Sequence, residues 1–155
     1  MKRTGIIIAL ALGVMTQNAM AKTLNVVASF SVLGDIVSQV GGDRVNVTTL
    51  VGPDGDPHSF EPSPQDSAML SKADIVVVNG LGLEGWLDRL VRASGFHGTL
   101  VVASDGIQTH TLKEEGKTVT DPHAWNNVAN GVRYAQNIQA ALVKADPQDA
   151  ADLNA

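Results

Sequence analysis

The tripeptide Asp-Pro-His occurs twice in this chain, ending on His58 in one copy and on His123 in the other. In each copy the proline fixes the backbone just before the histidine, so the imidazole is held at a defined angle. Two neutral imidazoles that converge are suitable ligands for Zn²⁺ or another first-row divalent cation. The pair therefore predicts a metal site, provided that the fold brings the two histidines together.

Three carboxylates lie beside these histidines in the sequence. Asp56 and Asp121 begin the two tripeptides, and Glu61 follows shortly after His58. Each could accept a hydrogen bond from the second ring nitrogen of a histidine and so fix its tautomer, as residues behind metal ligands commonly do. The residues alone leave open the alternative that both histidines are ordinary solvated residues of proline-rich loops. Two ligands also hold a divalent ion only weakly, since a structural zinc site has four.

An alternation of strands and helices must position these loops. Four apolar runs predict β-strands, at 24–28, 45–51, 74–79 and 100–103. Apolar residues at helical spacing predict helices at 32–40, 64–73, 86–95 and 128–142. This order predicts an α/β fold, in which a four-stranded parallel sheet carries helices on both faces.

Ligands of such a sheet bind beyond the carboxyl ends of its strands. The His58 loop follows the second predicted strand and the His123 loop follows the fourth, so both should reach that end of the sheet. Ser63, Pro64 and Asp66 form the pattern of a capping box with proline at the first helical position, which should end the His58 loop. A polar loop is expected between the fourth strand and Asp121.

Composition excludes several classes of function. The chain has 155 residues, with 11 Lys and Arg against 16 Asp and Glu, and this acidic balance argues against a nucleic acid partner. It has no cysteine, which excludes a thiol nucleophile, an iron–sulfur cluster, a cysteine-ligated zinc and a disulfide.

The first 21 residues are expected to be a secretory signal peptide. Lys2 and Arg3 are followed by an apolar stretch at 6–15, and Ala19 and Ala21 supply small residues for a cleavage site. The alternative, a transmembrane anchor, would need an apolar run of about 20 residues. After cleavage near Ala21 we expect a soluble periplasmic protein.

Four segments together resemble the periplasmic receptors that bind zinc or manganese for ABC importers. In chain order they are VVASFSVLGDI at 26–36, DPHSFEPSPQD at 56–66, ADIVVVNGLGLEGW at 73–86 and DPHAW at 121–125. The resemblance implies one lobe of a two-lobed receptor, with the metal between lobes that a long helix joins. It implies that His58 and His123 are metal ligands and that Glu61 supports them. It also implies a permease in the inner membrane as the partner.

The same resemblance implies how the chain divides. Residues 1–21 would be the signal peptide, 22–125 the N-terminal metal-binding lobe, and 126–155 the start of the inter-lobe helix. The family's remaining ligands, a Glu or His and an Asp, belong to a C-terminal lobe that this chain does not contain. We therefore expect a fragment, the alternative being a self-sufficient half-receptor.

Two other classes of function compete with a receptor. A small secreted zinc hydrolase would use His58 and His123 as ligands and Glu61 as general base, but neither a third protein ligand nor an H-E-x-x-H helix is present. A surface adhesin would need a lipid-anchor cysteine. We therefore expect a non-enzymatic protein that carries Zn²⁺ or Mn²⁺ as transported ligand, with the choice of metal left open.

The other distinctive residues receive ordinary structural roles at this stage. His97 and His110 are expected to be solvated loop residues, and Trp86 a core residue. Asn79 and Gly80 are expected to form a turn. The glycine-rich run 80–85 follows the third strand rather than the first, which argues against a dinucleotide site.

Overall fold

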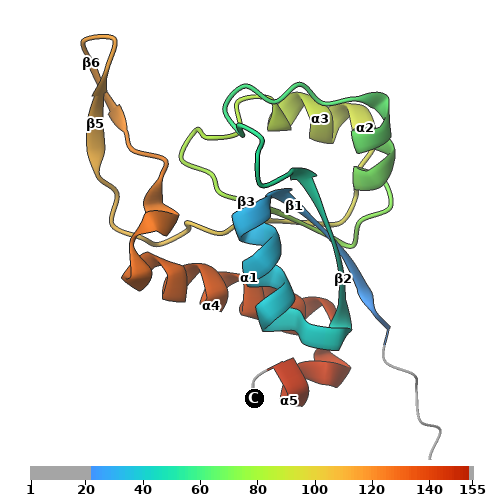
Figure 1. Cartoon of the computed structure of the whole chain (residues 1–155). Helices are drawn as coiled ribbons and strands as arrows, with labels where there is room; N and C mark the ends of the chain where they lie inside the picture. Colours follow the sequence, from blue (N-terminus) through green and yellow to red (C-terminus); the bar gives the residue numbers. More distant parts are fainter. Residues whose placement is uncertain (1–21, 154–155) are drawn as a thin grey trace, which may run out of the picture.

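The structure is a computed structural model that describes residues 22–153, so the predicted signal peptide lies outside the described residues. Its main sheet is four-stranded and entirely parallel, in the order β2-β1-β3-β4 (Figure 1). The strands are β1 (Leu24–Phe30), β2 (Val45–Val51), β3 (Ile75–Val78) and β4 (Thr99–Val102). The predicted α/β fold with a parallel sheet is thus confirmed.

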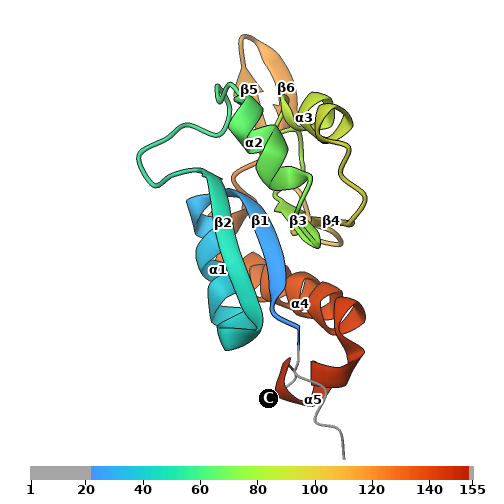
Figure 2. The same ribbon diagram turned by 90° about the vertical axis from the view of Figure 1, so that its right-hand side faces the viewer.

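Helices cover both faces of this sheet (Figure 2). The four main helices are α1 (Ser31–Gly41), α2 (Pro64–Leu70), α3 (Leu87–Ser94) and α4 (Val128–Ala145). The helices α1 and α4 contact each other on one face, and α2 and α3 contact each other on the other. Short helical turns complete the chain: η1 (Gly42–Arg44), η2 (Ala124–Asn126), η3 (Pro147–Asp149) and α5 (Ala150–Leu153).

The core lies between the sheet and its helices. All four residues of β3 are buried, as its unbroken apolar run predicts. Along α4, Tyr134, Ile138 and Leu142 form a buried stripe at one-turn spacing, so this helix packs into the same core as the sheet. On the same helix Val128 and Val132 are exposed. Within residues 22–153 no helix is long and apolar enough to cross a membrane.

The capping box after the His58 loop is present. The Ser63 hydroxyl accepts from the backbone N–H of Asp66, and the Asp66 carboxylate accepts from the backbone N–H of Ser63 at 2.7 Å. Pro64 occupies the first helical position. These contacts fix where the long His58 loop ends and α2 begins.

The segment between β4 and α4 is not only a polar loop, and here the expectation was wrong. It contains an antiparallel hairpin of β5 (Thr111–Glu114) and β6 (Lys117–Thr120). Glu115 and Gly116 form its turn with φ of 48° and 77°, the positive values that a tight two-residue hairpin turn requires. Each strand has only one large apolar residue, Leu112 or Val119, which left the alternating pattern too weak to recognise.

A close backbone approach at Gly98 gives a test of the sheet's packing. A Cβ at this position would lie 2.3 Å from the backbone oxygen of Asp74 and 2.9 Å from that of Ala73. We expect Gly98→Ala to lower the free energy of unfolding by about 1–3 kcal/mol, the usual cost of overpacking, as measured by urea denaturation.

The matched control is Gly131→Ala in α4, where a Cβ would meet no atom within 4 Å. Alanine should stabilise this helical position by up to about 1 kcal/mol. Equal stability of Gly98→Ala and the parent chain would contradict the described approach of Gly98, just before β4, to the backbone of Ala73 and Asp74, just before β3.

Candidate metal centre

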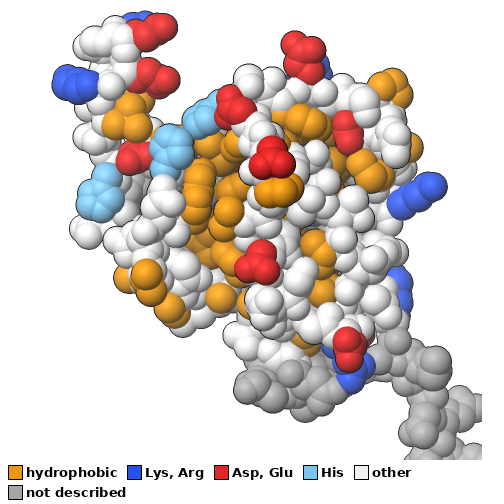
Figure 3. Space-filling model, in the orientation of Figure 1, with side chains coloured by type: hydrophobic (Ala, Val, Ile, Leu, Met, Phe, Trp, Pro, Cys, Tyr) orange, Lys and Arg blue, Asp and Glu red, His pale blue; other side chains and the backbone are white. Residues whose placement is uncertain are grey.

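The two histidines of the Asp-Pro-His repeats meet in the structure. The Nε2 atoms of His58 and His123 lie 3.3 Å apart, and the ring centroids are separated by 5.3 Å. Because β2 and β4 are the two edge strands, this meeting requires both loops to reach toward the middle of the sheet. Figure 3 shows histidine side chains gathered on the surface at the base of the β5–β6 hairpin, with acidic side chains beside them.

The separation of the two nitrogens matches the geometry of a shared metal ion. Two nitrogens bound to one tetrahedral Zn²⁺ at about 2.0–2.1 Å lie about 3.3–3.4 Å from each other. Without a cation, the same separation allows one ring to donate a hydrogen bond to the other. Both rings are exposed, so an ion would keep open positions for further ligands.

Asp121 orients the ring of His123. Its Oδ1 lies 2.8 Å from His123 Nδ1 and also accepts from the backbone N–H of His123 at 3.0 Å. These two contacts, the backbone one first, hold the pKa of Asp121 below its usual value. An ionised carboxylate at Nδ1 keeps the proton on that nitrogen and leaves Nε2 free to bind a cation.

Unlike Asp121, neither Asp56 nor Glu61 forms a described hydrogen bond with a histidine ring. Asp56 accepts from the backbone N–H of His58 at 2.9 Å and from the Ser59 hydroxyl at 2.8 Å, and these bonds lower its pKa. It therefore shapes the loop, and in the described part of the chain no hydrogen bond joins it to the His58 ring. Glu61 is exposed, and no hydrogen bond joins it to either histidine in the described part of the chain. The sequence could not separate these roles, because all three carboxylates lie within three residues of a histidine.

The histidine pair does not complete a metal site by itself. Across residues 22–153 no three side chains of the types His, Cys, Asp and Glu are placed to hold one ion together.

Two tryptophans fix the histidine loops. Trp86 is buried as predicted, and its Nε1 also donates to the backbone oxygen of Pro57, next to His58, at 2.8 Å. The ring of Trp125 lies 5.4 Å from that of His123 and 4.9 Å from that of Phe30. Each Asp-Pro-His loop is thereby attached to a large aromatic side chain.

Asn79 anchors the loop that carries His123. From the sequence this residue was assigned only to a turn, and this role was missed. Its side chain is fully buried at the end of β3, where Nδ2 donates to the backbone oxygen of Pro122 at 2.9 Å. Its Oδ1 accepts from the Tyr134 hydroxyl at 2.6 Å, and its backbone oxygen accepts from Ser104 at 2.6 Å. Asn79 therefore joins β3, α4 and the residue just before His123.

The buried carboxylate of Glu84 fixes the turn at Asn79 and Gly80. This carboxylate accepts from the Ser29 hydroxyl at 2.7 Å and from the backbone N–H groups of Asn79 at 2.7 Å and Gly80 at 3.1 Å. A buried carboxylate is tolerable only with such partners. The sequence feature that could have indicated this role is an acidic residue inside the glycine-rich run 80–85, which directly follows a buried strand.

Comparisons with known proteins identify a family and a fold. The family model described as ZnuA, zinc-uptake complex component A, periplasmic, matches residues 26–155. The chain is similar to the manganese-binding lipoprotein MntA of Halalkalibacterium halodurans, with 42% identity over 127 residues that cover 82% of this chain and 41% of the relative. It is also similar to the manganese ABC transporter substrate-binding lipoprotein PsaA of Streptococcus pneumoniae, with 35% identity over 81% of this chain and 43% of the relative.

Solved structures of related metal-binding proteins have the same fold as this chain. The Mn-bound periplasmic metal binding protein from Candidatus Liberibacter asiaticus superposes with a TM-score of 0.76 at 33% identity, covering 84% of this chain and 49% of that one. The metal-dependent lipoprotein YcdH from Bacillus subtilis gives a TM-score of 0.74 at 30% identity, covering 84% and 48%. The chain thus spans about half or less of the length of these proteins.

The buried network can be tested through Tyr134, the only tyrosine in the chain. Burial, and then the charge of Glu84, raises the pKa of Tyr134 to about 12. We expect the phenolate absorbance of the folded chain to appear with a midpoint near about 12, against about 10 in the urea-unfolded chain. Since the folded state binds this proton more tightly, stability should be unaffected by Tyr134 below about pH 10 and fall as the pH rises toward 12.

Circular dichroism over the same range shows whether the chain is still folded. A midpoint near 10 in the folded chain would mean that Tyr134 is not buried near Glu84 as described.

Proposed function

The chain belongs to the family of the periplasmic zinc-uptake component, and from this premise we propose that it captures Zn²⁺ or Mn²⁺ for import by an ABC transporter. The observation that carries the proposal is the 3.3 Å separation of the His58 and His123 Nε2 atoms, which suits one shared cation. We propose these two histidines as the ligands contributed by the described residues.

The neighbouring residues would prepare the ligands. In this proposal Asp121 fixes the tautomer of His123, and Asp56 fixes the backbone that carries His58. Glu61 stays a predicted supporting residue without a described contact. Affinity would come from neutral imidazoles, so protonation of the imidazoles at low pH would compete with the metal.

The rest of the receptor is also a proposal. Because the relatives are about twice as long as the matched region, we propose that this region corresponds to one half of a receptor, with further ligands from a second lobe. The family description supports work in the periplasm, and the transporter relatives support a membrane permease as partner. The relatives are named as metal-binding or substrate-binding proteins, so the hydrolase alternative has no support.

The choice of metal follows from the ligands only in part. Two imidazoles completed by carboxylates suit zinc, manganese and ferrous iron, and intrinsic affinity favours zinc over manganese. Some relatives are named for manganese and another, MtsA of Streptococcus pyogenes, for iron.

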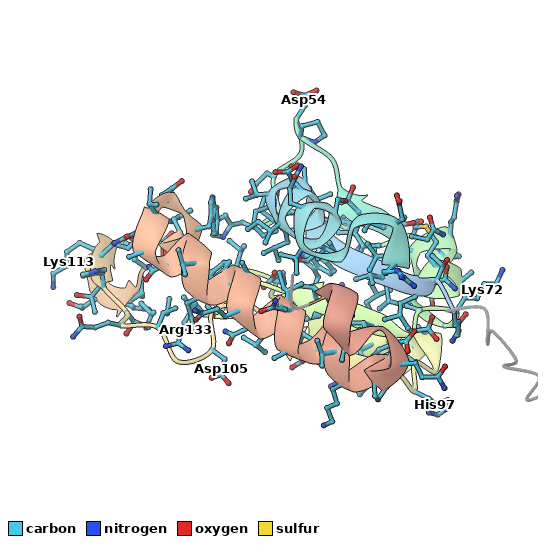
Figure 4. The ribbon with its side chains drawn as sticks, turned by 90° about the horizontal axis from the view of Figure 1, so that it is seen from below. Asp54, Lys72, His97, Asp105, Lys113 and Arg133 are labelled. Atoms are coloured by element: carbon cyan, nitrogen blue, oxygen red, sulfur yellow. The ribbon has the colours of Figure 1, made fainter. Side chains whose placement is uncertain are left out.

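Removing either histidine tests the proposed ligands. We expect His58→Ala and His123→Ala each to weaken Zn²⁺ binding by more than about a hundredfold, beyond the 10–100-fold typical of residues behind a ligand. Calorimetry on the purified chain measures this for Zn²⁺ and Mn²⁺. The control is His97→Ala, because Figure 4 shows His97 at the far end of the molecule from the hairpin that carries Lys113. Binding that both site variants retain at the parent level would rule out the proposed ligands.

Removing the charge behind His123 tests the role of Asp121. Asp121→Asn replaces the carboxylate at His123 Nδ1 and should weaken Zn²⁺ binding by about 10–100-fold. Asp54→Asn is the matched control, since Asp54 lies at the tip of the same long loop as His58 and points away from the body (Figure 4). If both variants bind equally well, Asp121 does not orient a ligand.

A further inference from the structure

The dipeptide Asn-Gly occurs twice in this chain, at Asn79–Gly80 after β3 and at Asn130–Gly131 near the start of α4. Asparagine before glycine is especially prone to deamidation, because glycine has no side chain that would hinder attack by its own backbone nitrogen. Asn79 is fully buried, whereas Asn130 is half-buried. The chain therefore places the same local chemistry in two different surroundings.

Deamidation at the first site would begin with attack of the Gly80 backbone nitrogen on Cγ of Asn79. The nitrogen gives up its proton, Nδ2 leaves as ammonia, and a succinimide ring closes. Water then opens the ring at one of its two carbonyl carbons, which leaves aspartate or isoaspartate. The net reaction consumes water, releases ammonia and requires no other reactant.

In the folded chain the attacking nitrogen is engaged in a hydrogen bond. The backbone N–H of Gly80 donates to Oε2 of the buried Glu84 at 3.1 Å. Loss of the Gly80 proton would place an amide anion directly beside this carboxylate. A neighbouring group of like charge disfavours the anion, so the hydrogen bond opposes the first step of the reaction.

The side chain under attack is also held in place. Nδ2 of Asn79 donates to the backbone oxygens of Pro122 at 2.9 Å and Gly80 at 3.0 Å, and Oδ1 accepts from the Tyr134 hydroxyl at 2.6 Å. Turning Cγ toward the Gly80 nitrogen would break these bonds in the core, where water does not replace them. Burial of Asn79 also excludes the water that must open the succinimide.

We propose that Asn79–Gly80 is a deamidation site, which the folded network keeps unreactive and which unfolding exposes. The proposal does not depend on metal binding. Its chemical basis is the Asn-Gly sequence, and its structural basis is the set of hydrogen bonds that occupy both reacting groups.

The modified chain could not rebuild the network. An aspartate at position 79 has no N–H group for the Pro122 oxygen and adds a second carboxylate beside Glu84. Isoaspartate also adds a methylene group to the backbone of the turn. Deamidation therefore converts a reversible unfolding event into a permanent loss of the anchor next to His123.

Peptide mapping by mass spectrometry tests the proposal, on the purified chain incubated at mildly alkaline pH either folded or in guanidinium chloride. In the unfolded chain Asn79 and Asn130 should deamidate at similar rates. In the folded chain Asn79 should react at least about a hundredfold more slowly than in the unfolded chain, because a site that reacts only after opening follows the open population. A folded chain that reacts at Asn79 as fast as the unfolded chain, or an unfolded chain that does not react there, would overturn the proposal.

The variant Tyr134→Phe tests whether the network gives this protection. It removes the hydroxyl that holds Oδ1 of Asn79 and keeps the ring. Deamidation of Asn79 in the folded variant should be about tenfold faster than in the parent chain, as expected for the loss of one buried hydrogen bond. Asn130 in the same sample is the internal control. Equal acceleration at both sites would report only a general loss of stability and would overturn the protective role of the network.

The variant Asn79→Asp reproduces one product of the reaction and tests its consequence. Its urea denaturation midpoint should lie clearly below that of the parent chain, because the Pro122 oxygen loses its donor. Asn130→Asp is the matched control, since an aspartate near the start of a helix is well tolerated. Equal midpoints for the two variants would contradict a permanent loss of the anchor.

Discussion

The buried pairing of Glu84 with the turn at Asn79 is the constraint on which the proposed metal centre depends. Both histidine loops attach to the segment that this pairing fixes: Trp86 donates to the loop of His58, and Asn79 donates to the loop of His123. Because the loops leave opposite edges of the sheet, their own backbone would not bring the imidazoles together. A rigid point between the edge strands is required, and the end of β3 supplies it.

The burial of these polar groups is compensated throughout. Glu84 accepts three hydrogen bonds, and within the described residues no buried side-chain nitrogen or oxygen lacks a partner. Such a network favours one arrangement, since breaking any member leaves a polar group unpaired in the core. The contact of Tyr134 with Asn79 extends it to α4, and Asn137 on the same helix donates to the backbone oxygens of Ala103 and Asp105. The long helix and the His123 loop are therefore held by the same residues.

Much of the framework could be predicted from the sequence, because its strands and helices depend on patterns among residues close together in the chain. The four strands and main helices follow from apolar periodicity, and the start of α2 follows from the capping box. From the repeated Asp-Pro-His we predicted that both histidine loops reach the same end of the sheet, and the two imidazole rings do lie together. The roles of Asp121 and Asp56 depend on which atoms face each other across a turn, which spacing does not encode. Asn79 has the sequence pattern of an ordinary turn residue, and only the packing of α4 and Pro122 against it reveals the network.

X-ray absorption spectroscopy at the zinc edge, on the purified chain loaded with one equivalent of Zn²⁺, would test the central claim most directly. The account predicts that each ion is bound by two imidazoles, with Zn–N distances of about 2.0–2.1 Å and the outer scattering that imidazole rings produce. A spectrum with oxygen neighbours only, or with a single imidazole, would contradict the claim that His58 and His123 share one cation.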